Sequence, residues 1–312
     1  MIEAHNLTKH YGEVTAVDDL SFSLRPGLVT GFLGPNGAGK TTTMRMILGL
    51  DRPTKGTVTV AGQSYHDLHA PLHEVGALID AKAMHGGRTA FNHLLCLAQS
   101  NAIPRSRIDD VLRLVGLSDV GSRRAGGFSL GMAQRLGIAA ALLGDPPVLL
   151  FDEPVNGLDP EGILWVRNLM RSLAAEGRTV LVSSHLMSEM ALTADHLLVI
   201  GRGRLIADAA VNDFVDGSSQ QSVLVRSPQA DDLVRALLVA GATADLEPDG
   251  GIGVRKLDAK AIGELAAREG IVLHELTPRR ASLEEAFMEL TRDSVDYHAG
   301  TPGAPGIQEV AV

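Results

Sequence analysis

One segment has the residue types and spacing of a phosphate-binding loop: Gly34-Pro35-Asn36-Gly37-Ala38-Gly39-Lys40-Thr41-Thr42, which matches G-x-x-x-x-G-K-[ST]. Its glycines allow backbone angles that a β-carbon disfavours, so successive N–H groups can point at phosphate oxygens. Lys40 would reach the β- and γ-phosphates of a nucleotide, and the Thr41 hydroxyl would ligate Mg²⁺. The alternative is a glycine-rich turn that binds nothing, and a strand before the loop and a helix after it argue against that alternative.

Two adjacent carboxylates follow an apolar strand further along the chain. Asp152 and Glu153 come directly after Val148-Leu149-Leu150-Phe151, and α/β sheets build their sites at the carboxyl ends of such strands. Asp152 is predicted to hold Mg²⁺ through its water shell, and Glu153 to polarise the attacking water as general base. Two solvated acids at a strand end would be the alternative if the upstream loop were absent.

The elements that must position these residues alternate between strand and helix. Near-continuous apolar runs predict buried strands at 28–33, 148–151 and 179–182, with a helix over 163–175 between the last two. Residues 90–143 have a helical pattern. This order implies a parallel sheet covered on both faces. Residues 197–207 are expected to close it with a hairpin.

A second unit is predicted after residue 217. Its pattern has the order of a split β-α-β-β-α-β unit: strand 222–227, helix 230–240, strand 243–247, strand 252–256, helix 259–268 and strand 271–276. A last helix carries Leu283, Ala286, Phe287 and Leu290 at amphipathic spacing. Its stripe is expected to pack on its own domain, with a dimer contact as the alternative.

Composition limits the class of protein. The chain has 312 residues with 28 Lys and Arg against 37 Asp and Glu, a net charge of −9. This balance argues against a sequence-blind nucleic-acid binder. The single Cys96 excludes an internal disulfide framework and fits a reducing compartment. No apolar run of about 18 residues is present and the N-terminus does not resemble a secretion signal, so we expect a cytosolic protein whose membrane role would come through a partner.

Further motifs, in the same order along the chain, resemble the ATP-binding subunit of ABC transporters. Tyr11 matches the aromatic residue that stacks on adenine. Ser129-Leu130-Gly131-Met132-Ala133-Gln134-Arg135 matches the signature segment, as a variant of the usual Ser-Gly-Gly-Gln. Asn156-Gly157-Leu158-Asp159 matches the D-loop, and His185 the switch histidine. The resemblance covers about residues 2–215 and is strongest to the single-domain subunits of bacitracin, lantibiotic or daunorubicin-like exporters.

The resemblance implies an α/β fold of the P-loop NTPase, ABC-type nucleotide-binding class. Its mixed sheet would have a RecA-like core, an antiparallel β subdomain and a helical subdomain, followed by a small α+β C-terminal domain. The expected divisions are an ATP-binding domain at 1–215 with the helical subdomain at about 81–143, an accessory domain at 216–293 and a disordered tail at 294–312.

The resemblance also implies a paired site. Ser129 lies where a helix begins, so its hydroxyl and nearby N–H groups form a second anion site. Two copies, head to tail, would sandwich ATP between the loop of one and Ser129 and Gly131 of the other, with Asp159 across the interface. His185 would contact the γ-phosphate and hold the water with Glu153. Asp80 stands where most members have a glutamine, and it is a further candidate Mg²⁺ ligand.

The predicted function is ATP hydrolysis that powers a separate integral-membrane permease exporting a drug, antibiotic peptide or lipid-like substrate. The chain would be cytoplasmic, peripheral on the inner face of the membrane, homodimeric and without a nucleic-acid partner. The alternative is a soluble, non-transport ABC ATPase acting on ribosomes or DNA, against which the single loop motif and the lack of sustained heptads argue. A non-hydrolysing module would be expected to lack Glu153 or His185. A GTPase would be expected to carry Asn-Lys-x-Asp.

Overall fold

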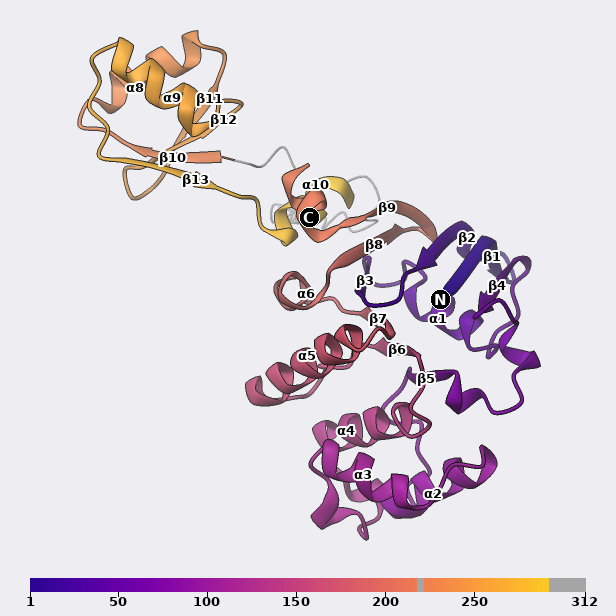
Figure 1. Cartoon of the computed structure of the whole chain (residues 1–312). Coiled ribbons are helices and arrows are strands. Elements are labelled where there is room, and N and C mark those ends of the chain that lie inside the picture. The colour runs from indigo at the N-terminus through magenta and orange to yellow at the C-terminus, as the bar shows by residue number, and fades with distance from the viewer. Residues whose placement is uncertain (218–221, 292–312) are drawn as a thin grey trace, which may run out of the picture.

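A six-stranded sheet forms the centre of the N-terminal unit, residues 1–217. The computed structural model describes these residues and 222–291 (Figure 1). The strand order is β5-β6-β7-β3-β8-β9. Five strands are parallel and β9 pairs antiparallel with β8, so the predicted closing hairpin is confirmed. The strands are β3 (Val29–Leu33), β5 (Val75–Leu78), β6 (Val148–Asp152), β7 (Thr179–Ser183), β8 (His196–Gly201) and β9 (Arg204–Ala210).

The central strands are buried on both faces, as their continuous apolar runs predict. In β6, Leu149 and Phe151 enter one hydrophobic core, while Val148 and Leu150 enter the other. The first core lies under α5 (Pro160–Ala175) and α6 (Met187–Thr193). The second lies under α1 (Lys40–Ile47). With both faces covered in this way, the carboxyl ends of β3, β6 and β7 lie at one edge of the sheet. The site residues come at or after these strand ends in the sequence.

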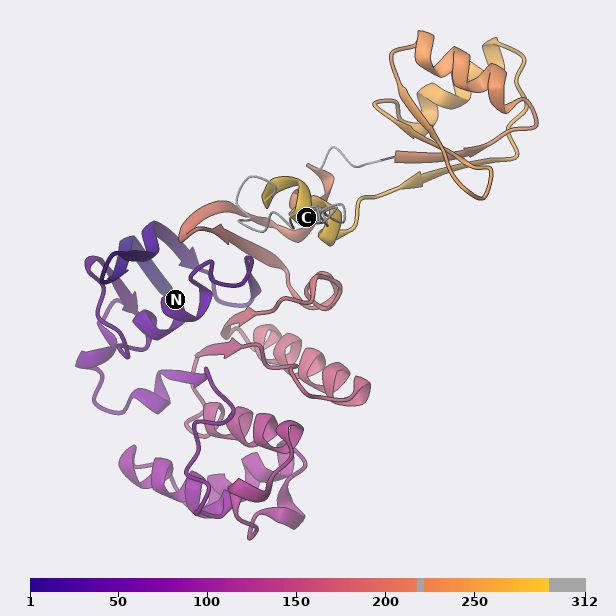
Figure 2. The same cartoon turned by 180° about the vertical axis from the view of Figure 1, so that it is seen from behind.

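A smaller antiparallel sheet closes over the α1 side (Figure 2). It has the order β2-β1-β4 and consists of β1 (Ile2–Tyr11), β2 (Val14–Leu24) and β4 (Lys55–Val60). Three helices form a separate layer at the β5 end: α2 (Ala90–Ser100), α3 (Ser106–Leu114) and α4 (Leu130–Ala141). A short helix, α7 (Val211–Asp216), follows β9.

The C-terminal unit, residues 222–279, has the predicted β-α-β-β-α-β order. Its sheet is antiparallel with the order β11-β12-β10-β13. The elements are β10 (Ser222–Arg226), α8 (Ala230–Val239), β11 (Thr243–Leu246), β12 (Ile252–Arg255), α9 (Ala259–Arg268) and β13 (Glu275–Arg279). The last strand begins later than predicted, because the Val272 N–H donates to Gln229 Oε1 instead of a strand ladder.

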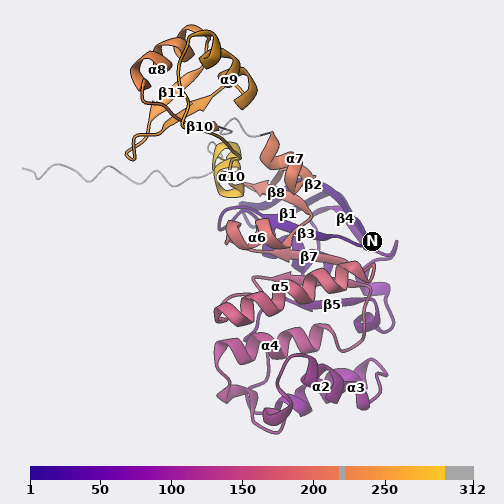
Figure 3. The same cartoon turned by 60° about the vertical axis from the view of Figure 1, so that its left-hand side comes forward.

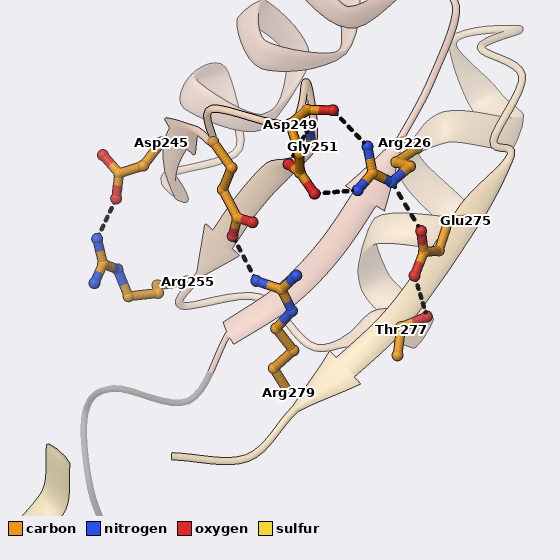
Figure 4. Close-up of polar contacts among 9 residues, drawn as sticks. Arg226, Asp245, Asp249, Gly251, Arg255, Glu275, Thr277 and Arg279 are labelled. Carbon is orange, nitrogen blue, oxygen red and sulfur yellow. Dashed lines mark hydrogen bonds and ion pairs between the residues drawn. The ribbon is translucent and has the colours of Figure 1, made fainter. Parts of the chain in front are cut away.

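One face of this small sheet is covered by α8 and α9, and the other carries ion pairs (Figure 4). Arg226 joins Asp249 and Glu275, Arg255 pairs with Asp245, and Arg279 with Glu247. The pairs Arg226–Glu275 and Arg255–Asp245 join neighbouring strands, and the other two tie β10 and β13 to the turn between β11 and β12.

The last helix, α10 (Leu283–Thr291), packs on the N-terminal unit and not on the unit it follows (Figure 3). Leu283, Ala286 and Phe287 are buried in the same core as Met190 of α6 and Phe214 of α7. The expectation that the stripe packs on its own domain is therefore wrong, because the apolar partners of these side chains belong to the N-terminal unit. Leu290, at the end of the stripe, is 45% exposed. The tail predicted at 294–312 lies outside the described residues.

Across residues 1–217 and 222–291, no helix combines the length and the apolar character that crossing a bilayer requires.

Candidate functional site

The glycine-rich loop connects β3 to α1 in a conformation that needs its glycines. Gly37 and Gly39 have φ of 81° and 104°, values that side chains with a β-carbon rarely adopt. Gly39 caps the first turn of α1, and a β-carbon there would lie 2.5 Å from the carbonyl oxygen of Ala16. The loop thus presents backbone N–H groups and a helix N-terminus to the same space, which is the arrangement for binding phosphate.

Lys40 is the buried cation of this loop. Its Nζ donates to the carbonyl oxygens of Gly34 at 2.6 Å and Pro35 at 3.2 Å. Burial lowers the pKa of Lys40, while the charges of Glu153 and Asp152 act to raise it. This ammonium group is partly desolvated and bonded to neutral carbonyls, so it would bind an anionic phosphate more strongly than it binds them.

Oxygen ligands suited to Mg²⁺ meet beside the loop. Thr41 Oγ1 donates to Asp152 Oδ2 at 2.6 Å, and Ser183 Oγ donates to the other carboxylate oxygen. Mg²⁺ is bound in such sites by one or two protein oxygens together with substrate phosphates, so this pair fits the ion. A pocket of about 310 Å³ opens here, and the loop, Ile79, Asp152 and Glu153 line it.

Glu153 lines the pocket, and His185 lies within hydrogen-bond distance of its side chain. His185 Nδ1 lies 2.8 Å from Glu153 Oε2, the distance of a hydrogen bond that the imidazole donates to the carboxylate. The Glu153 side chain is 24% exposed and His185 51% exposed, so both remain accessible to a ligand.

Glu153 itself has an unusual backbone, with a φ of 51°. Its N–H donates to Ser183 Oγ at 3.0 Å, and its carbonyl accepts from Gln134 Nε2 at 2.7 Å. Sequence reasoning did not place Ser183 in the site, and it placed Gln134 in the signature segment without a contact to Glu153. Ser183 pairs with Asp152 in the register of β6 and β7, so the expected parallel sheet was the signal that could have found it.

Other predicted residues lie outside this pocket. The Ser129 hydroxyl accepts from the Met132 N–H at 3.2 Å and caps α4, next to Gly131, while Asp159 accepts from the Gly162 N–H at 2.8 Å and caps α5. Asp80 Oδ1 accepts from the Lys82 N–H at 2.7 Å, and only its neighbour Ile79 lines the pocket. The Mg²⁺ role of Asp80 therefore stays a prediction.

Tyr11 is half exposed at the end of β1. Its hydroxyl donates to Asp51 Oδ2 at 2.8 Å, and Lys9 Nζ lies 4.9 Å from its ring centroid. Burial and the nearby Asp51 carboxylate raise the pKa of Tyr11. An anchored ring of this kind can stack on a base.

A phosphate loop, a hydroxyl–carboxylate pair and a carboxylate–imidazole pair on a parallel sheet define a nucleotide-hydrolysing P-loop enzyme. Comparison with known proteins gives the family. The ABC transporter family model matches residues 17–156, and a domain of unknown function matches 221–284. An uncharacterized ABC transporter ATP-binding protein of Bacillus subtilis, YhcH, is 38% identical over 300 residues, which cover 94% of this chain and 97% of that protein.

The bacitracin transport ATP-binding protein BcrA of Bacillus licheniformis is 43% identical, covering 67% of this chain and 69% of its own length. A solved ATP-binding subunit of an ABC transporter superposes with a TM-score of 0.64 at 26% identity, covering 69% of this chain and 92% of that one. The chain belongs to the ABC transporter ATP-binding proteins, and it is an ATPase.

Proposed function

We propose that this chain powers export by a separate membrane permease, and that it does so as a dimer with ATP held between two copies. The observation that carries the dimer is the position of Ser129 and Asp159. Both lie at helix N-termini outside the pocket of their own chain. A helix N-terminus is an anion site, and Ser129, next to Gly131, would complete the pocket of a second copy.

Within one pocket, the loop N–H groups and Lys40 would bind the β- and γ-phosphates, and Tyr11 would stack on adenine. Thr41 and Asp152 would hold Mg²⁺, which would neutralise charge on the phosphates. Glu153 would orient the attacking water and accept its proton, because its carboxylate faces the pocket. His185 would hold that carboxylate and contact the γ-phosphate.

The names of the relatives support a class of cargo. One relative is named for bacitracin transport, and a daunorubicin resistance ATP-binding protein of Streptomyces coeruleorubidus is 34% identical over 91% of this chain. We infer a drug, an antibiotic peptide or a lipid-like molecule as the exported substrate. The chain would then be attached to the inner membrane face through its permease.

Purification of the tagged chain from detergent-solubilised membranes tests this proposal. We expect an integral-membrane protein to co-purify in a stoichiometric ratio, and its addition in vesicles to raise the ATPase rate. Lys40→Ala is the matched control, because it should keep the permease and lose the rate. Recovery of ribosomes without a membrane protein would contradict export and favour a soluble ABC ATPase.

A further inference from the structure

The backbone of Glu153 is held in a conformation that it would not keep unaided. A φ of 51° lies in the left-handed region, which a glutamate rarely adopts. Such residues persist when the surrounding structure fixes them, and they cluster at active sites. The groups that hold this peptide therefore set where the Glu153 carboxylate points.

Two side chains hold it from opposite sides. Ser183, at the end of β7, accepts from the Glu153 N–H. Gln134 Nε2 donates to the Glu153 carbonyl at 2.7 Å. Gln134 is only 3% exposed, so its amide is shielded from water, and losing this hydrogen bond would leave a partly buried carbonyl without that donor.

Gln134 belongs to α4, the helix that begins at Ser129. Leu130 stands four residues before Gln134, so both lie on one helix face. Leu130 packs on Gly157 of the D-loop: a β-carbon at Gly157, whose φ is 74°, would lie 2.3 Å from Leu130 Cδ2. The first turns of α4 thus contact the 153–158 loop at two points, one polar and one apolar.

We propose that Gln134 is a positioning residue that ties the catalytic carboxylate of a chain to the signature helix of the same chain. The inference rests on the proposed dimer, in which Ser129 at the tip of α4 binds the ATP of the other site. Closure on that ATP shifts α4, and the Gln134 and Leu130 contacts carry the shift to Glu153. Filling of one site therefore raises the rate of hydrolysis at the other.

The test is steady-state ATP hydrolysis by the full chain carrying Gln134→Met, which keeps length and removes the donor. We expect kcat to fall about tenfold with the KM for ATP within about twofold, because a positioning hydrogen bond is lost and phosphate binding is not. The Hill coefficient for ATP should fall from above 1 in the wild type to about 1. Gln99→Met, an exposed glutamine on α2, is the matched control and should change neither.

Leu130→Ala gives an independent reading, because Leu130 is 45% exposed and its loss should not prevent folding. It should also lower the Hill coefficient. If the wild type dimerises on ATP with a Hill coefficient above 1 and Gln134→Met behaves like Gln99→Met, this inference is overturned and the proposed function stands. If the wild type shows neither dimer nor cooperativity, both are overturned.

Discussion

Lys40 has a lowered pKa because it is buried, and this has a consequence for binding. A bound triphosphate favours the charged lysine, so it raises the pKa again. At a pH above the lowered pKa, binding must therefore take up a proton. We expect ATP affinity to decline over a pH range that lies below the ordinary titration range of lysine, where the phosphates stay ionised.

Calorimetry in buffers of different ionisation enthalpy measures this proton uptake directly. The uptake should grow as pH rises within that window. Proton uptake that stays at zero up to pH 10 would show that Lys40 is already charged in the free protein.

Glu153 is expected to be needed for hydrolysis of the nucleotide and not for its binding. Glu153→Gln removes the base and keeps the side chain's size, so kcat should fall by about 10²- to 10⁴-fold while nucleotide affinity stays within about twofold. Glu161→Gln, an exposed acid on α5, is the control. Phosphate release and fluorescent-nucleotide binding give the two quantities, and an unchanged kcat would remove Glu153 from the base role.

At this scale, sequence motifs predicted the residues that are contiguous in the chain. The loop from Gly34 to Thr42 and the Asp152–Glu153 pair could be named because their chemistry and spacing stand together. The contacts of Ser183 and Gln134 with Glu153 could not be predicted, because each arises only through the packing of β7 and α4. The left-handed backbone of Glu153 has no sequence signal, since it is fixed by those neighbours.

Helix α10 is predicted to stabilise the N-terminal unit. Phe287 is 8% exposed in its core, and Phe287→Ala should reduce the free energy of unfolding by about 3–5 kcal/mol. Met288→Ala, 62% exposed on the same helix, should change it by less than about 0.5 kcal/mol. The one tryptophan, Trp165, lies in α5, so its fluorescence in urea reports this unit. Equal effects of the two variants would contradict the assignment.

The C-terminal unit is expected to become less stable in acid, because the ion pairs on its sheet face lose their carboxylate charges. The Gly251 N–H and the Arg226 guanidinium lower the pKa of Asp249. A carboxylate whose pKa is lower in the folded state stabilises that state above its unfolded pKa, and the contribution is lost as pH falls below about 4.

Hydrogen exchange of peptides from residues 222–279 should therefore speed up as the pH falls through this range, after correction for intrinsic rates. Asp249→Asn should flatten that dependence. Glu264→Gln, an exposed acid on α9, should leave it unchanged. The same acid response in Asp249→Asn as in the wild type would show that other groups cause it.

The helices and strands were largely predictable from the sequence, but which other elements they pack against was not. Apolar periodicity gave the strands of the central sheet and the order of the C-terminal unit, because burial on one or both faces dictates those patterns. The stripe of α10 showed that the helix needs a partner, but the same stripe would fit either unit. The start of β13 was misplaced because Gln229, far away in sequence, takes the Val272 N–H.

On the scale of the whole molecule, the C-terminal unit and the helices α2 to α4 lie at opposite ends of the central sheet. The C-terminal unit lies beyond the β9 end of the central sheet, and α2 to α4 lie beyond the β5 end (Figures 1 and 3). The phosphate loop is between them, with α10 bringing the chain back to α6, the helix that follows His185. A dimer built on the loop and Ser129 would involve α4 at the β5 end, because Ser129 caps that helix.

The central claim, a pocket shared between two copies, is tested most directly by mixing two inactive variants. Lys40→Ala damages the loop side and Ser129→Arg the signature side, so each alone should be inactive. A mixed dimer has one intact site, and random pairing of an equimolar mixture should restore ATPase activity. About a quarter of the wild-type rate is the upper limit, reached if the two sites act independently, and coupling between the sites would lower it. Lys40→Ala mixed with Glu153→Gln should restore nothing, because both lesions lie on the loop side. A Lys40→Ala and Ser129→Arg mixture no more active than its components would contradict the shared pocket.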